Sequence, residues 1–150
     1  MANSSSQNPC GRILLVDDNS LGLAARRSVL EELGHRVHTS ATAADALELC
    51  AKHNFDVVVT DYKMPKMNGV EFIGRLRKLH PAISVILISG FADTLGLDET
   101  TTGADAVLQK SANEVAQLIR AVNRLLRKQQ GPKKPVASQA GVKAEKRKPR

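Results

Sequence analysis

The sequence predicts an α/β fold in which one parallel sheet is covered by helices on both faces. Short apolar runs rich in β-branched residues recur along the chain, which is typical of strands buried on both sides. Between these runs, apolar residues recur at helical spacing. Five strand–helix alternations imply right-handed crossovers and hence a doubly wound, three-layer α/β sandwich.

Length and composition favour a cytoplasmic protein. The 150 residues suffice for one domain with a substantial core, and 42% hydrophobic content is ordinary for a globular chain. No apolar run reaches the roughly 18 residues of a membrane span. The N-terminal stretch lacks the apolar centre of a signal peptide. We therefore expect no membrane association. Cys10 and Cys50 do not have the spacing of a metal site, and Cys50 fits a helix core.

Most of the net charge of +7 belongs to the C-terminal tail. Residues 129–150 carry seven Lys or Arg against one Glu, so the rest of the chain is nearly neutral. The tail is rich in Pro, Lys and Ala and has no apolar periodicity, which predicts disorder. We divide the chain into a disordered leader (1–11), a folded unit (12–128) and a disordered basic tail (129–150).

Four of the expected strands lead to a polar or charged residue. The strands and the residues that end or follow them are Arg12–Val16 with Asp17 and Asp18, Asp56–Thr60 with Asp61, Ser84–Ser89 with its own Ser89, and Ala106–Gln109 with Lys110. Arg36–Thr39 is a weaker strand.

Capping residues and apolar spacing define the helices. Asn19 or Ser20 begins the first, Ser40 or Thr42 the second, and Asn113 the last, while the third follows Gly69. The inward residues we expect are Leu21, Ala25, Val29 and Leu33; then Ala43, Ala46, Leu47 and Cys50; then Phe72, Ile73, Leu76 and Leu79; and finally Val115, Leu118, Ile119, Val122 and Leu126. The segment from 91 to 103 predicts at most a short helix.

The polar strand ends predict a site for phosphoryl chemistry. Carboxyl ends of parallel strands meet at one edge of a sheet, where ligands bind in open α/β folds. Three carboxylates gathered there repel one another unless a cation is present, and oxygen ligands suit Mg²⁺. A carboxylate can also attack phosphorus, while a lysine and a hydroxyl can hold the oxygens of the transferred group.

These residues form motifs that resemble the receiver domain of two-component response regulators, the CheY-like superfamily. The motifs are VDDN (Val16–Asn19), VVVTDYKMPKMNG (Val57–Gly69), ILISG (Ile86–Gly90) and a strand that ends at Lys110. The resemblance covers about residues 12–128. It implies a flavodoxin-like (βα)5 fold with strand order 2-1-3-4-5.

The resemblance also implies a role for each site residue. Asp61 would accept the phosphoryl group, Lys110 would pair with its oxygens, and Ser89 would move inward to bond it. Asp18 and Asp61 would bind Mg²⁺ directly, together with the backbone carbonyl of Lys63, and Asp17 would act through water. Two positions depart from the family: Val107 replaces the usual aromatic residue, and Ser111 replaces the proline after the lysine.

We expect a stand-alone response regulator that is not an enzyme beyond its own phosphorylation and dephosphorylation. Its donor would be a sensor histidine kinase or a histidine phosphotransfer protein, and its output would act on an effector protein. The chain itself would be a monomer or a phosphorylation-dependent dimer. The alternative is a pseudo-receiver, an interaction module that phosphorylation does not regulate. Its basic tail could contact nucleic acid, although it has no aromatic residues for base stacking.

Overall fold

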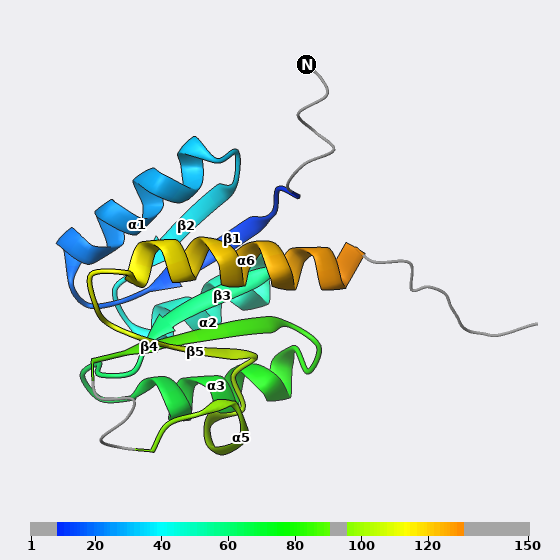
Figure 1. Ribbon diagram of the computed structural model, residues 1–150. Helices are drawn as coiled ribbons and strands as arrows, with labels where there is room; N and C mark the ends of the chain where they lie inside the picture. The colour runs from blue at the N-terminus through cyan, green and yellow to red at the C-terminus, as the bar shows by residue number, and fades with distance from the viewer. Residues whose placement is uncertain (1–8, 91–95, 131–150) are drawn as a thin grey trace, which may run out of the picture.

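Five parallel strands form one sheet in the computed structural model, which describes residues 9–90 and 96–130. The strands are β1 (Arg12–Val16), β2 (Arg36–Ser40), β3 (Val57–Asp61), β4 (Ser84–Ser89) and β5 (Ala106–Gln109). Their order is β2-β1-β3-β4-β5, which confirms the expected topology. The central strand β3 therefore lies between β1 and β4 (Figure 1).

Helices cover both faces of this sheet (Figure 1). They are α1 (Ser20–Glu32), α2 (Ala43–Lys52), α3 (Gly69–Leu79), the single turn α5 (Glu99–Thr102) and α6 (Glu114–Gln130). The alternation along β1 shows how the core is divided. Ile13 and Leu15 pack with α1 and α6, whereas Leu14 and Val16 pack with α2 and α3. Among the described helices, none combines the length and the apolar character that crossing a bilayer requires.

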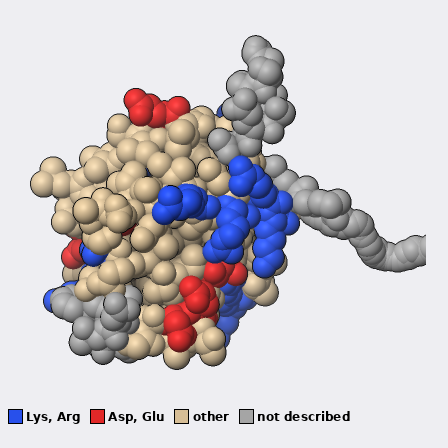
Figure 2. Space-filling model, viewed as in Figure 1, with Lys and Arg blue, Asp and Glu red and all other residues tan. Residues whose placement is uncertain are grey.

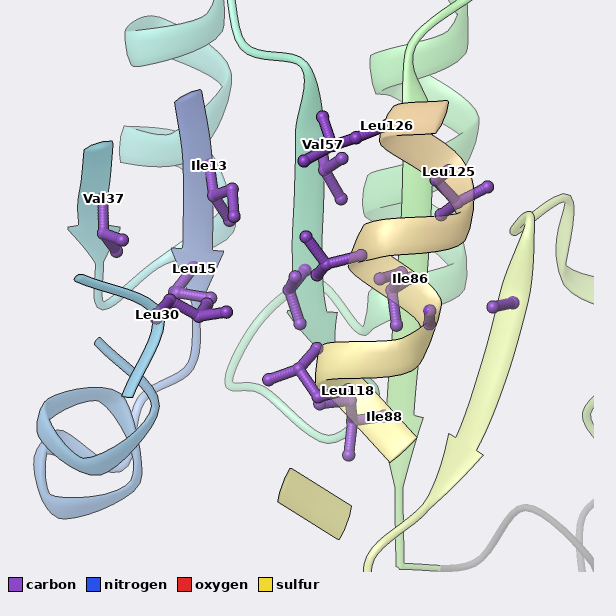
Figure 3. Close-up of a cluster of buried hydrophobic side chains, with 14 of the residues drawn as sticks. Ile13, Leu15, Leu30, Val37, Val57, Ile86, Ile88, Leu118, Leu125 and Leu126 are labelled. Carbon is purple, nitrogen blue, oxygen red and sulfur yellow. The ribbon is translucent and has the colours of Figure 1, made fainter. Parts of the chain in front are cut away.

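The helix α6 supplies much of the core on the first face (Figure 3). Leu118, Leu125 and Leu126 lie over β3 and β4 and are almost fully buried. The prediction for this helix was wrong at Val115, which is exposed, and it omitted Leu125. The inward position of the first turn is instead held by Glu114, which lies four residues before Leu118 on the same helix face.

The predicted inner face of α1 was also wrong. The expected residues were Leu21, Ala25, Val29 and Leu33, of which Leu21 is 81% exposed and Leu33 45% exposed. The buried residues are Leu23, Arg26 and Leu30. A strict spacing of four drifts by about 40° per turn from the helical period, so it cannot follow one face for long. Arg26 hid the true face because an arginine interrupts the apolar pattern.

Most element ends agree with the predicted caps. Asn19 and Thr42 cap α1 and α2 as predicted, and Gly34 adopts a positive φ of 98° after α1. The third helix begins at Gly69 itself and is capped by Asn68, a cap that was not predicted. Some ends differ by one or two residues: β2 runs to Ser40, β3 spans Val57–Asp61 instead of Asp56–Thr60, and α6 continues two residues past 128. Leu79, expected on the inner face of α3, is exposed beside a surface cavity. Residues 1–8, 91–95 and 131–150 lie outside the described part, and with them most of the predicted leader and tail.

Candidate functional site

A cavity of about 290 Å³ lies at the carboxyl edge of the sheet. It is lined by Asp17, Asp18, Asn19, Asp61, Lys63, Ser89, Gly90 and Lys110. The structure thus brings together all six residues that the sequence nominated, from the ends of β1, β3, β4 and β5. This convergence follows from the parallel topology, because every strand in the sheet ends at the same edge.

Close backbone packing fixes the position of Asp61. The residue ends the central strand, lies opposite Ile88 of β4 and is 95% buried. The next residue, Tyr62, is held on both sides: its N–H donates to the Ile88 carbonyl and its own carbonyl accepts from the Gly69 N–H. A Cβ atom on Gly69 would lie 2.6 Å from the Asp61 carbonyl oxygen, so only glycine allows α3 to begin there.

Three carboxylates gather in the cavity. Ligand oxygens of Asp17, Asp18 and Asp61 lie within 4.8 Å of one another. Burial raises the pKa of Asp61, and the charge of Asp17 raises it further, while the Lys110 ammonium opposes both. The site therefore disfavours its own negative charge when no cation or cationic ligand is present.

Lys110 offsets part of this charge. Its Nζ lies 3.0 Å from Asp61 Oδ1, and its backbone N–H donates to the Ser89 carbonyl at 2.9 Å. This backbone bond ties the end of β5 to the end of β4 and aims the lysine side chain toward the central strand. Ser89 itself is almost fully buried at the cavity wall.

Asp17 is engaged differently from the other two acids. Its Oδ1 accepts the Asn19 N–H at 3.0 Å, and its Oδ2 accepts Arg26 Nη1 at 2.8 Å. Arg26 Nε also donates to Glu114 Oε2 at 2.7 Å. Burial disfavours the charge of Arg26, but its bonds to Glu114 and Asp17 outweigh this and raise its pKa. Sequence reasoning missed Arg26; the signal was a charged residue between Leu23 and Leu30 at core spacing.

The donor set fits a hard divalent cation. All three acids offer oxygen ligands, which Mg²⁺ prefers. Both oxygens of Asp17 already accept N–H donors, so this residue suits an indirect contact through water. Asp18 is exposed, and Asp61 has a second oxygen besides the one facing Lys110, so these two suit direct contact.

Comparison with known proteins gives one consistent result. The model of the response regulator receiver domain family matches residues 13–123. A receiver domain protein (CheY-like) from Methanospirillum hungatei has a TM-score of 0.73 at 30% identity, covering 81% of this chain and 98% of that one. Response regulator TrrA from Thermotoga maritima, solved in complex with Mg(2+)-BeF, has a TM-score of 0.69 at 30% identity, covering 76% of this chain and 97% of that one.

Curated relatives are much longer proteins. The gliding motility regulatory protein of Myxococcus xanthus is 33% identical over 135 residues, which is 83% of this chain but 17% of that protein. Sensor kinase CckA of Brucella abortus is 31% identical over 78% of this chain and 13% of its own length. Receiver domains act in two-component signalling as phosphoacceptors rather than as conventional enzymes. With its matching fold, strand-end acids and lysine, this chain belongs to the response regulator receiver domain family.

Proposed function

We propose that this chain accepts a phosphoryl group on Asp61 in a Mg²⁺-dependent reaction and thereby switches a protein-interaction surface. The donor is a phosphohistidine of a sensor histidine kinase or of a histidine phosphotransfer protein. The observation that supports this best is the contact of 3.0 Å between Lys110 Nζ and Asp61 Oδ1, inside a cavity that two more aspartates line.

The reaction is a displacement at phosphorus. A lone pair of the Asp61 carboxylate forms a P–O bond while the P–N bond of the phosphohistidine breaks, and the bonding electrons return to the imidazole nitrogen. The products are an aspartyl phosphate on this chain and a free histidine on the donor. Attack of water on the same phosphorus later releases inorganic phosphate and restores the carboxylate.

Each surrounding residue has a defined part in this step. The Lys110 ammonium and the Ser89 hydroxyl bind oxygens of the transferred group, where negative charge is spread in the transition state. Asp18, Asp61 and the Lys63 carbonyl would hold Mg²⁺ directly, and Asp17 would hold it through water. When bound, Mg²⁺ neutralises charge on the carboxylates and on the phosphoryl oxygens.

The output follows from the added charge. A phosphoryl group brings about two negative charges at pH 7 to the carboxyl edge. The surface that responds is formed by α5, β5 and α6, of which β5 ends next to Lys110, and it contacts an effector protein. We assign this role to the receiver unit alone, because the chain spans less than a fifth of the two curated relatives described above.

Phosphorylation by a small donor tests this function. Incubation with Mg²⁺ and acetyl phosphate should add the mass of one phosphoryl group to the intact chain, and hydroxylamine should remove it as expected for an acyl phosphate. Asp61→Asn should abolish the gain completely because no other residue in the cavity has the same position opposite Lys110. Omission of Mg²⁺ should have the same effect.

The matched control is Asp45→Asn. Asp45 is exposed in the first turn of α2, so this variant removes the same charge away from the cavity and should be phosphorylated like the wild type. A wild-type chain that gains no mass, or an Asp61→Asn variant that gains it normally, would refute the phosphoacceptor role. The first outcome would favour a pseudo-receiver.

A further inference from the structure

One buried arginine connects the acid cluster with the start of α6. Arg26 lies on α1 with 7% exposure, and its guanidinium bonds Asp17 Oδ2 through Nη1 and Glu114 Oε2 through Nε. The two carboxylates are nine residues before and 88 residues after it in the chain. The planar guanidinium can hold two carboxylates at once through different N–H groups, which a lysine cannot do with the same geometry.

The strand β5 has no side chain that could connect the cavity with the surface in the way that Arg26 does. Val107 lies on β5 opposite Leu87, half-buried in the core cluster under α2 and α3. It is a stiff, β-branched side chain with no polar group that could respond to a charged phosphoryl group bound near Ser89. Within the described residues, Arg26 is the side chain that bonds both an acid of the cavity and an acid of α6.

We propose that Arg26 is a positioning residue that couples Asp17 to the first turn of α6. Binding of Mg²⁺ and of the phosphoryl group at the carboxyl edge then changes how firmly α6 is held, through Arg26 on α1. This inference rests on the proposed function, because it takes Mg²⁺ and the phosphoryl group as the input. It assigns the output route to an ion-pair chain on the α1–α6 face of the sheet.

The physical reason is competition for one cation. In the unloaded state Asp17 and Glu114 share the guanidinium. A metal near Asp17 neutralises part of its charge, which weakens its hold on Arg26 and leaves more of that attraction for Glu114. Glu114 lies in the first turn of α6, so that turn becomes more tightly held. Linkage requires the reverse effect as well: contacts that fix α6 change the affinity of the site for its cation.

Hydrogen exchange of the α6 amides measures the coupling. In the wild type, saturating Mg²⁺ with acetyl phosphate should slow exchange in the first two turns of α6 by roughly fivefold or more, the lower end of typical allosteric couplings. In Arg26→Gln this slowing should vanish while phosphorylation of Asp61 persists. Arg26→Lys should not restore it, since one ammonium cannot bridge both acids.

Two further variants keep the test decisive. Arg27→Gln removes the same charge from the next position of α1, where Arg27 pairs with Glu31 at the surface, and should leave the slowing intact. Glu114→Gln leaves the bond between Arg26 and Asp17 in place but removes the negative charge on α6 that attracts Arg26, so it should abolish the slowing even if Arg26→Gln fails to fold.

The outcomes separate this inference from the proposed function. Absence of phosphorylation in the wild type would overturn the function itself. Normal phosphorylation together with undiminished slowing in Glu114→Gln or Arg26→Gln would overturn only the coupling. A lower melting temperature with unchanged slowing would assign Arg26 a purely structural role and would equally contradict the coupling.

Discussion

Two cavities of nearly equal size lie at opposite edges of the sheet. The one at the carboxyl edge measures about 290 Å³ and is lined by three aspartates and two lysines. The one at the amino edge measures about 300 Å³, and its lining includes Cys50, His53, Phe55 and His80 but no acid, lysine or arginine. Burial raises the pKa of Cys50 to about 11, so this thiol is unreactive near neutral pH. Charge that converges on one point distinguishes the functional cavity, whereas volume does not.

The acids near the two edges differ in the same way. Asp105 Oδ2 accepts the Val85 N–H at 2.8 Å and Arg77 Nη2 at 3.0 Å, and Asp56 Oδ2 accepts the Arg12 N–H at 2.8 Å. These carboxylates complete hydrogen bonding where strands begin. Asp61, in contrast, faces like charges and one lysine that is partly exposed. Asp105 and Asp56 therefore stabilise the fold, whereas Asp61, kept among other acids, is available to a ligand.

Metal binding should give the largest difference between the two edges. Mg²⁺ at a hundred times its dissociation constant should stabilise the wild type by about 2.7 kcal/mol, because the ligand binds only the folded state. Asp61→Asn should lose most of this gain, whereas Asp56→Asn should keep it. Urea unfolding with Mg²⁺ or with a chelator measures both. Equal gains in the two variants would show that the cation binds elsewhere.

Removal of an acid at the amino edge should lower the stability of the fold by a somewhat smaller amount and leave the phosphorylation site intact. Asp105→Asn should lower the free energy of unfolding by about 1.5–2 kcal/mol, near the low end for hydrogen bonds to charged groups because the site is part-exposed. Phosphorylation by acetyl phosphate should continue. Asp61→Asn in the presence of a chelator should cost less than Asp105→Asn. The reverse ranking would contradict the division between structural and functional acids.

Acidification should give the smallest effect, which can be seen only as a difference in stability between the wild type and Asp61→Asn. The folded-state pKa of Asp61 lies above its ordinary value of 3.8, so ionisation of this residue costs stability. With a chelator present, the wild type should gain stability relative to Asp61→Asn as the pH falls from 7 through the raised pKa toward 3.8. Thermal unfolding across this range measures the difference. Saturating Mg²⁺ should remove the trend, and its persistence with metal would argue against a cation beside Asp61.

The strand ends could be predicted from the sequence, whereas the inner faces of two helices could not. Strands and their terminal residues were predictable because an apolar run such as Val57–Val59 has few alternatives and parallel strands share an edge. The inner face of α1 was not, since Arg26 is buried only through partners on β1's end and on α6. Its burial depends on the tertiary structure, and no local pattern encodes it. Val115 was mispredicted for the same reason, because Glu114 takes the inward position to meet Arg26.

The position of Tyr62 has a practical consequence for experiments in solution. The chain has a single tyrosine and no tryptophan, so all tyrosine emission of the protein comes from this one ring. The ring belongs to the residue next to Asp61, and its backbone is bonded on both sides to β4 and α3. The ring packs against the core under α2 and α3, so tyrosine emission of the unlabelled protein reports on the packing of the segment that follows Asp61. A change there on addition of a cation or a phosphodonor can be followed in real time without an added dye.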